Sequence, residues 1–222
     1  MPLTIIPVTT KKEMKQFICF NYALYKDSPY AVPELYTDVR DTLDPNKNAA
    51  FEFCEAQPFI ALRDGKVVGR IVAIINHKAN SVWNKKAVRF GWVDFIDDVE
   101  VVDALFATVE QWGRERGMTE AHGPLGFTDF DPEGMLVEGF DRVSTMALIY
   151  NHPYYPEHMK KHGYVKETGW VEYRITIPEE ISESHRQLCD VVTQRYGLKV
   201  KKLTRRQIKK LDYGRKLFKL IN

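Results

Sequence analysis

Three carboxylates lie close together in the stretch Phe95-Ile96-Asp97-Asp98-Val99-Glu100. This stretch precedes a predicted helix, and the N–H groups and dipole at a helix start favour a bound anion by about 0.3–2 kcal/mol. A carboxylate about 5 Å from a phosphate opposes that binding by roughly 3 kcal/mol at an effective dielectric of 20. We therefore expect this loop to repel a phosphate-bearing ligand, unless a basic residue such as Lys78, Lys85 or Arg89 folds over it.

Histidine and carboxylate clusters elsewhere do not predict a metal site. His158 and His162 have the spacing of two ligands on one helical face, but no third ligand is evident, so we expect exposed surface histidines there. The acidic stretch 129–134 begins like a calcium loop, but Phe140 occupies the position that requires a carboxylate. The chain contains no Gly-x-Ser-x-Gly, Walker or Cys-x-x-Cys motif, which leaves hydrolase, NTPase and zinc-protein interpretations without support.

A predicted strand–helix–strand unit positions the acidic loop. Residues 88–96 are rich in β-branched and aromatic side chains, and residues 99–117 follow the helical period. Asp97 and Glu100 have the spacing of a capping box with Asp97 as the cap, and Gly117 is placed to end the helix. The helical stripe expected to face the sheet consists of Val102, Leu105, Phe106, Val109 and Trp112.

The remaining elements surround this unit. Residues 3–8 predict an opening strand, and Thr10 with Glu13 predicts a capped helix after it. Residues 59–63 and 67–75 predict a hairpin around Asp64-Gly65, a dipeptide that favours a type I′ turn. A short helix is expected over residues 154–162, followed by a strand pair or one bent strand over 165–177, and then a helix, a strand and a helix.

Composition and charge narrow the class of protein. The 222 residues, 44% of them hydrophobic, can bury a sizeable core, and no apolar run approaches the roughly 20 residues of a membrane span. No secretory signal is apparent, and three cysteines outside any Cys-x-x-Cys pair fit a reducing cytoplasm, so a cytoplasmic location is expected. Residues 195–222 contain 11 basic and one acidic residue, whereas residues 1–194 contain 21 basic and 29 acidic residues.

The order strand, helix, hairpin, strand, helix, strand, helix, strand resembles the GCN5-related N-acetyltransferase (GNAT) superfamily over residues 3–177. DGKVVGRIVAIIN resembles the second and third strands of that fold, and VEVVDALFATVEQWGRERGM resembles its long helix. YPEHMKKHGYVKE resembles its closing segment. The combination of GRIVAIIN, HGP, EGFD and YNHPYY is also similar to a bacterial subgroup of GNAT-like proteins.

The resemblance implies an α/β fold with a mixed sheet flanked by helices, and acyl transfer from acetyl-CoA or another acyl-CoA to an amine. It implies that the acyl-CoA lies between two splayed parallel strands, with its pyrophosphate at the start of the long helix. The segment that would bind it here consists of Val93, Asp94, Phe95, Ile96, Asp97 and Asp98. No metal is implied. The partners would be a small-molecule acyl donor and an amine acceptor, and a homo-oligomer is one assembly that the resemblance allows.

Two positions depart from the family pattern. The family's glycine-containing pyrophosphate loop is replaced by the acidic loop, and the tyrosine that protonates the leaving thiolate is replaced by Met159. Tyr154 and Tyr155 lie one turn earlier and could substitute, although packing of a proline-flanked helix start is the alternative for both. Two hypotheses therefore stand: an N-acyltransferase, or a catalytically degenerate GNAT-fold domain that binds a ligand or partner.

Domain boundaries follow the same resemblance. Residues 1–177 are expected to form the GNAT-like domain and residues 178–222 a basic C-terminal extension. That extension could contact nucleic acid or an anionic membrane, dock on the acidic body, or begin a truncated second domain. It lacks the interleaved aromatic residues of single-strand binders, so docking or truncation is favoured over nucleic acid.

Overall fold

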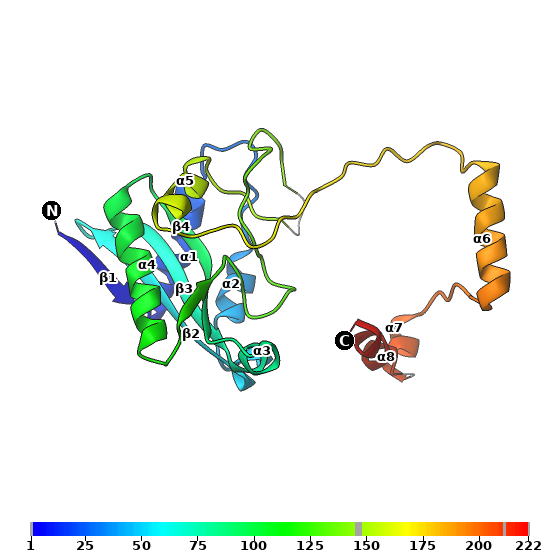
Figure 1. Cartoon of the computed structure of the whole chain (residues 1–222), viewed down its shortest axis with the longest axis horizontal. Coiled ribbons are helices and arrows are strands. Elements are labelled where there is room, and N and C mark those ends of the chain that lie inside the picture. Colours follow the sequence, from blue (N-terminus) through cyan, green and yellow to red (C-terminus); the bar gives the residue numbers. More distant parts are fainter. Residues whose placement is uncertain (1, 145–147, 211, 222) are drawn as a thin grey trace. The chain divides into compact units, whose positions relative to one another are not determined.

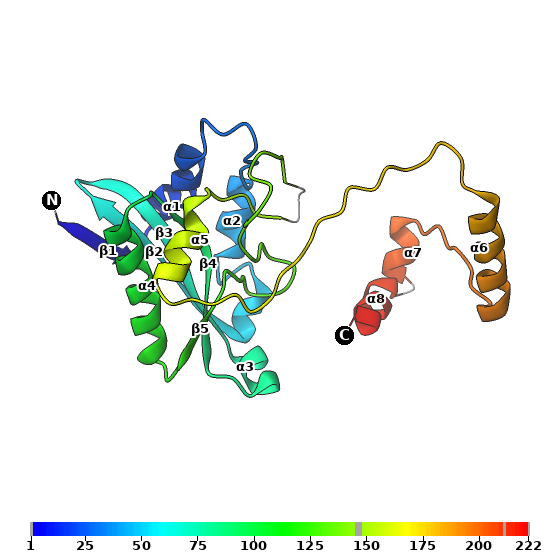
Figure 2. The ribbon, with the colours of Figure 1, turned by 45° about the horizontal axis from the view of Figure 1, so that its top comes forward.

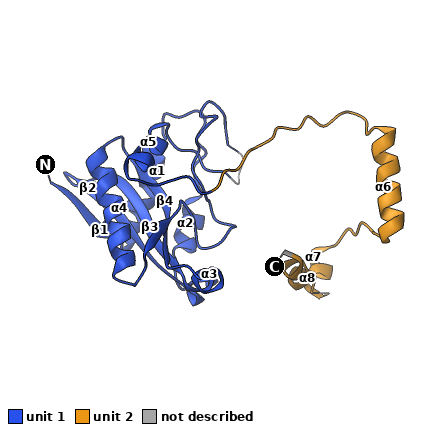
Figure 3. Cartoon of the chain, in the orientation of Figure 1, with its two compact units in different colours: residues 1–167 blue, residues 168–222 orange. Residues whose placement is uncertain are grey.

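The computed structural model describes residues 2–144, 148–210 and 212–221. The chain divides into two compact units, residues 1–167 and residues 168–222, which Figure 3 colours separately. Within the described residues, none of the helices is both long and apolar enough to cross a membrane. The candidate site lies entirely within the first unit.

The first unit is built on a five-stranded sheet in the order β1-β2-β3-β4-β5. Its strands are β1 (Leu3–Pro7), β2 (Cys54–Arg63), β3 (Lys66–Asn76), β4 (Ala87–Phe95) and β5 (Glu120–His122). Neighbouring strands are antiparallel except for β4 and β5, which are parallel. The predicted hairpin is confirmed: β2 and β3 pair along their lengths, and Asp64 and Gly65 both have positive φ, as a type I′ turn requires.

Helices cover both faces of this sheet (Figure 1). The helices before β4 are α1 (Lys11–Leu24), α2 (Tyr36–Thr42), the 3-10 helix η1 (Ala49–Glu52) and α3 (His77–Trp83). Those after it are α4 (Val99–Arg114), which joins β4 to β5, and α5 (Tyr154–Lys161). The predicted capping box of α1 is confirmed, since the Thr10 hydroxyl accepts from the Glu13 N–H and the Glu13 carboxylate accepts from the Thr10 N–H.

The alternation of β3 separates two hydrophobic cores. Ile71, Ala73 and Ile75 face α4 and α5, whereas Val72 and Ile74 face α1 and α2. The predicted stripe of α4 is confirmed, because Val102, Leu105, Phe106 and Val109 are fully buried and Trp112 packs against the same core. The sheet is therefore held in a three-layer arrangement, which fixes the position of β4 from both sides.

Two sequence predictions about strands are wrong. Residues 165–177 form no strand, and the segment between the C-terminal helices forms none either. The second unit instead contains α6 (Glu183–Tyr196), α7 (Arg205–Lys210) and α8 (Tyr213–Ile221). Alternation of apolar residues favours a strand, but a strand also needs a neighbouring edge to satisfy its N–H and C=O groups, and sequence alternation does not supply one.

Candidate active site

The end of β4 extends beyond the part of the strand that pairs with β5. The two parallel strands pair only from Ala87 to Arg89 on β4, and the Leu125 N–H then donates to the Phe90 carbonyl at 2.8 Å. Residues 92–95 continue past this point toward the start of α4, as Figure 2 shows. The pairing of the two strands therefore ends beside the segment that the sequence analysis predicted to bind an acyl donor.

Two tyrosines of α5 occupy the edge of β4 at its last residue, Phe95. The Phe95 N–H donates to Tyr155 Oη at 3.1 Å, and Tyr154 Oη donates to the Phe95 carbonyl at 2.7 Å. The rings of Phe95 and Tyr155 are stacked with their centroids 4.1 Å apart. The structure therefore brings the predicted tyrosines directly onto the predicted binding segment, and the tyrosine hydroxyls satisfy both peptide groups of Phe95.

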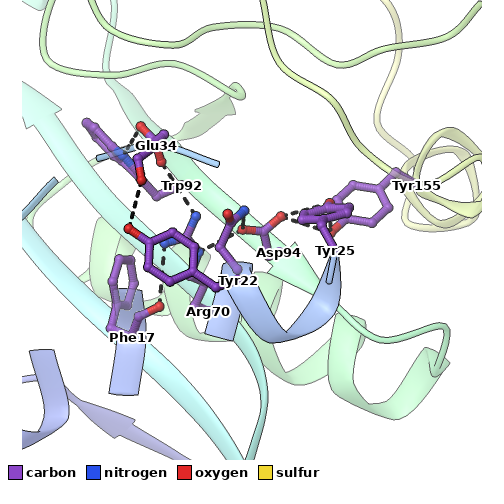
Figure 4. A network of polar contacts seen from close by, with 9 residues as sticks. Phe17, Tyr22, Tyr25, Glu34, Arg70, Trp92, Asp94 and Tyr155 are labelled. Carbon is purple, nitrogen blue, oxygen red and sulfur yellow. Dashed lines mark hydrogen bonds and ion pairs between the residues drawn. The ribbon is translucent and has the colours of Figure 1, made fainter. Parts of the chain in front are cut away.

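A buried carboxylate, Asp94, joins Tyr155 to Tyr25 and Arg70, which lie beside it in Figure 4. Asp94 Oδ2 accepts from Arg70 Nε at 2.7 Å, and its Oδ1 accepts from the hydroxyls of Tyr25 and Tyr155 at 3.0 and 3.1 Å. Arg70 and Asp94 are only 2% and 5% exposed, so this pair is screened little by water. Burial, with the Asp94 charge as a second cause, raises the pKa of Tyr25 and of Tyr155.

A second carboxylate, Glu34, extends this network to the bulged part of β4. Its Oε1 accepts from Trp92 Nε1 at 3.2 Å, and its Oε2 lies 3.7 Å from Arg70 Nη2. Burial raises the pKa of Glu34, although a third of its side chain still reaches solvent. Two carboxylates and one guanidinium leave this cluster with a net negative charge when both acids are ionised.

The sequence analysis missed Arg70, Glu34 and Tyr25. One signal was present. Arg70 is the single charged residue within the apolar stretch that forms most of β3, and a buried guanidinium requires a carboxylate partner. Nothing in the sequence showed which of the many carboxylates that partner would be.

The start of α4 differs from the prediction in its capping residue. Asp98, and not Asp97, is the N-cap, and its Oδ1 accepts from the N–H groups of Glu100 and Val101 at 3.0 and 3.4 Å. Asp97 instead lies 2.7 Å from His158 Nε2. The helix begins at Val99, as predicted, so the carboxylate of Asp98 directly before it reaches the helix N–H groups and that of Asp97 points to α5.

A basic residue does reach the acidic loop, and it is Arg63 at the end of β2. Its Nη1 lies 2.6 Å from Asp98 Oδ2 and its Nη2 lies 2.7 Å from Glu100 Oε2. This guanidinium lowers the pKa of Asp98. Lys85 and Arg89, which the sequence suggested for this role, line a different pocket. The local repulsion of a phosphate is therefore smaller than three isolated carboxylates would produce.

The prediction of exposed surface histidines on α5 is wrong. His158 is only 4% exposed, and His162 has most of its side chain buried. Each histidine has its own carboxylate, Asp97 for His158 and Asp103 for His162, at 2.7 and 2.6 Å. These pairs join α5 to the start of α4, so the histidines anchor the helix that carries Tyr154 and Tyr155.

The end of β4 and the helix start differ in how well they suit an acyl-CoA. Val93 and Ile96 are half-buried against the core, so their side chains are the apolar surface that a narrow acyl or pantetheine chain could contact at the end of β4. At the helix start, the Asp98 carboxylate already accepts from the N–H groups that a diphosphate would use. Arg63 is the one cation that contacts this carboxylate among the described residues, so the site fits the chain of such a donor better than its diphosphate.

The sequence of this chain is similar to parts of two larger bacterial proteins. No protein-family model matches it. It is 33% identical over 156 residues to the protein YghO of Escherichia coli, covering 70% of this chain and 40% of that protein. It is 32% identical over 182 residues to the bacterial ceramide synthase of Caulobacter vibrioides, covering 82% of this chain and 47% of that protein. The chain thus spans less than half the length of these curated relatives.

Solved structures with similar folds are acetyltransferases of low sequence identity. A tandem GNAT protein from the clavulanic acid biosynthesis pathway is 15% identical, with a TM-score of 0.49 over 73% of this chain and 43% of that chain. An aminoglycoside acetyltransferase from an uncultured soil metagenomic sample is 14% identical, with a TM-score of 0.47 over 79% of this chain and 97% of that chain. The first unit has the fold class that the resemblance to the GNAT superfamily implied, a mixed five-stranded sheet flanked by helices, with β4 and β5 as its parallel pair.

Proposed function

We propose that the first unit transfers an acyl group from a thioester donor such as acyl-CoA to an amine. The observation that carries this proposal is the arrangement at Phe95, where two tyrosine hydroxyls bind the end of β4 and a buried carboxylate network meets them. The similarity to a bacterial ceramide synthase supports the same class of reaction, because a ceramide is an N-acylated long-chain amino alcohol. A long-chain primary amine is therefore the first acceptor to test.

Tyr154 is the hydroxyl that we assign to the reacting thioester. It is half-buried and points at the Phe95 carbonyl, whereas Tyr155 is fully buried and bonded to Asp94. Burial raises the pKa of Tyr154 above the ordinary value of 10. A thiol has a pKa near 8.5, so complete proton transfer from this tyrosine to a leaving thiolate is unfavourable. Tyr154 has a single hydroxyl proton, so it is expected to turn from the Phe95 carbonyl and donate a hydrogen bond to the developing thiolate, which then takes its proton from solvent.

Glu34 is the group that we assign to the amine. An amine must lose its proton before it attacks a thioester, and a carboxylate with a raised pKa accepts that proton more readily than an ordinary one. Glu34 is also the member of the network that retains contact with solvent, which an incoming amine requires. Arg70 and Trp92 hold its two oxygens, so its orientation is set before the acceptor arrives.

The test is a thiol-release assay on the purified chain with palmitoyl-CoA and a long-chain amine, with acetyl-CoA as a second donor. Tyr154→Phe and Glu34→Gln should each lower the amine-dependent rate about tenfold or more. Tyr164→Phe is the matched control, because Tyr164 is also a half-buried tyrosine bonded to a carboxylate, Glu110, outside this network. Equal losses in Tyr154→Phe and Tyr164→Phe would contradict the assignment. Donor binding without any amine-dependent thiol release would favour a binding module instead.

A further inference from the structure

A second concave region lies at the opposite end of β4 from Phe95. A pocket of about 210 Å³ is formed by α3, the residues that follow it, the first residues of β4 and the last residue of β5. Arg89 on β4 is six residues before Phe95, which corresponds to about 20 Å along a strand. The polar and aromatic side chains that line this pocket are Asn80, Trp83, Lys85, Arg89 and His122.

Arg89 is a half-buried guanidinium that lacks an ion-pair partner in the folded unit. Its Nη1 donates to the carbonyls of Gly126 and Phe127 at 3.1 and 3.3 Å. Across residues 2–144, 148–210 and 212–221, no carboxylate oxygen lies within 4.0 Å of it, although the charges of Asp131 and Glu133 act on it from farther away. Burial lowers the pKa of Arg89, because a guanidinium loses part of its hydration in this position and its two acceptors are neutral carbonyls.

The contrast with Arg70 indicates what the pocket lacks. Arg70 is buried on the same sheet and is satisfied by the carboxylate of Asp94 at 2.7 Å. Arg89 has carbonyl acceptors but no such anion, and it faces a pocket rather than a packed core. A bound anion in the pocket would give Arg89 the charge compensation that Asp94 gives Arg70.

The rim of the pocket already holds one anionic group from the chain itself. The Glu167 carboxylate lies 3.2 Å from Lys85 Nζ and 2.5 Å from His122 Nε2. Lys85 and His122 lower the pKa of Glu167. The Glu167 side chain is 54% exposed, so a ligand can displace it into solvent at small cost.

We propose that this pocket is a binding site for a phosphate monoester. Arg89 and Lys85 supply two positive charges and His122 a polar ring, and once Glu167 moves aside these two charges suit a dianion better than a single carboxylate. Trp83 lies on the pocket lining with 73% of its surface exposed, and its ring can pack against an organic group attached to the phosphate. This proposal is independent of the acyl-transfer proposal, because it uses none of the residues at Phe95.

The experiment is calorimetric titration of the full chain with inorganic phosphate and with phenyl phosphate, at matched ionic strength. Both probes should bind, and phenyl phosphate should bind more tightly. Lys85→Gln should weaken both probes about fivefold or more, and Glu167→Gln should tighten both about threefold or more. Lys86→Gln is the control, because Lys86 is an exposed neighbour outside the pocket lining and should leave both affinities unchanged.

Two further variants separate the parts of the site. Arg89→Gln should weaken both probes more than Lys85→Gln does, and its fold is checked by circular dichroism because Arg89 also supports residues 126 and 127. Trp83→Ala should weaken phenyl phosphate and leave inorganic phosphate unchanged, which distinguishes a site for an organic phosphate from a site for the free ion. Equal losses in Lys85→Gln and Lys86→Gln, or weaker binding in Glu167→Gln, would overturn the proposal.

Discussion

Replacing Asp94 by Ala should be among the most destabilising single changes in the first unit. The change leaves Arg70 charged and 2% exposed with Glu34, 3.7 Å away, in place of its close partner, and it removes the acceptor of Asn21, Tyr25 and Tyr155. Breaking a buried ion pair from one side costs about 3–5 kcal/mol. That loss is a large fraction of the 5–15 kcal/mol that typically holds a domain folded, so the variant should unfold at much lower urea concentration.

The assay is urea unfolding followed by tryptophan fluorescence and near-ultraviolet circular dichroism, with two comparison variants. Arg114→Gln removes a mostly exposed pair with Glu110 on α4 and should cost less than about 1 kcal/mol. The double variant Arg70→Met with Asp94→Leu removes both charges and should be more stable than Asp94→Ala. A loss below about 1 kcal/mol in Asp94→Ala, or a loss equal to that of Arg114→Gln, would refute the reasoning that burial makes this pair strong.

Three further predictions follow from the same structure. Phe106→Ala should cost about 3–5 kcal/mol in urea unfolding, since Phe106 is fully buried between α4 and the sheet, and a loss under 1 kcal/mol would contradict its core position. Free CoA should bind with a Kd above about 100 μM in calorimetry. The double variant Asp98→Asn with Glu100→Gln frees Arg63 from its carboxylates and should tighten CoA binding about tenfold. Micromolar binding of CoA by the unchanged chain would contradict this prediction. The pKa of Glu34 in the folded state is raised above its ordinary 4.5. At a pH between the pKa of the unfolded state and that of the folded state, Glu34 therefore holds its proton only in the folded state. Stability should therefore fall as the pH rises through that window from about 4.5, and Glu34→Gln should remove this fall in thermal melts; an unchanged pH profile in the variant would argue against the raised pKa.

The elements that depend on neighbouring residues could be predicted from the sequence. The 3.6-residue stripe from Val102 to Val109 identified the buried face of α4, and the alternation around Asp64-Gly65 identified the hairpin. The segment Val93 to Asp98 and the pair Tyr154 and Tyr155 were named as candidates, and the structure brings them into contact. Their roles in binding and catalysis stay predictions. Periodicity and turn chemistry act over a few residues, and this is the range that a single sequence displays.

The partners of the charged residues were decided by the tertiary structure alone. Arg63 reaches Asp98 across 35 positions of sequence, His158 reaches Asp97 across 61, and Tyr25 meets Tyr155 across 130. The cap of α4 moved by one residue because Asp97 and Asp98 are equally good caps, and only the position of α5 gives Asp97 a different partner. An ion pair depends on the distance between two atoms in the folded chain, and sequence spacing does not encode that distance once the chain has turned back through a sheet.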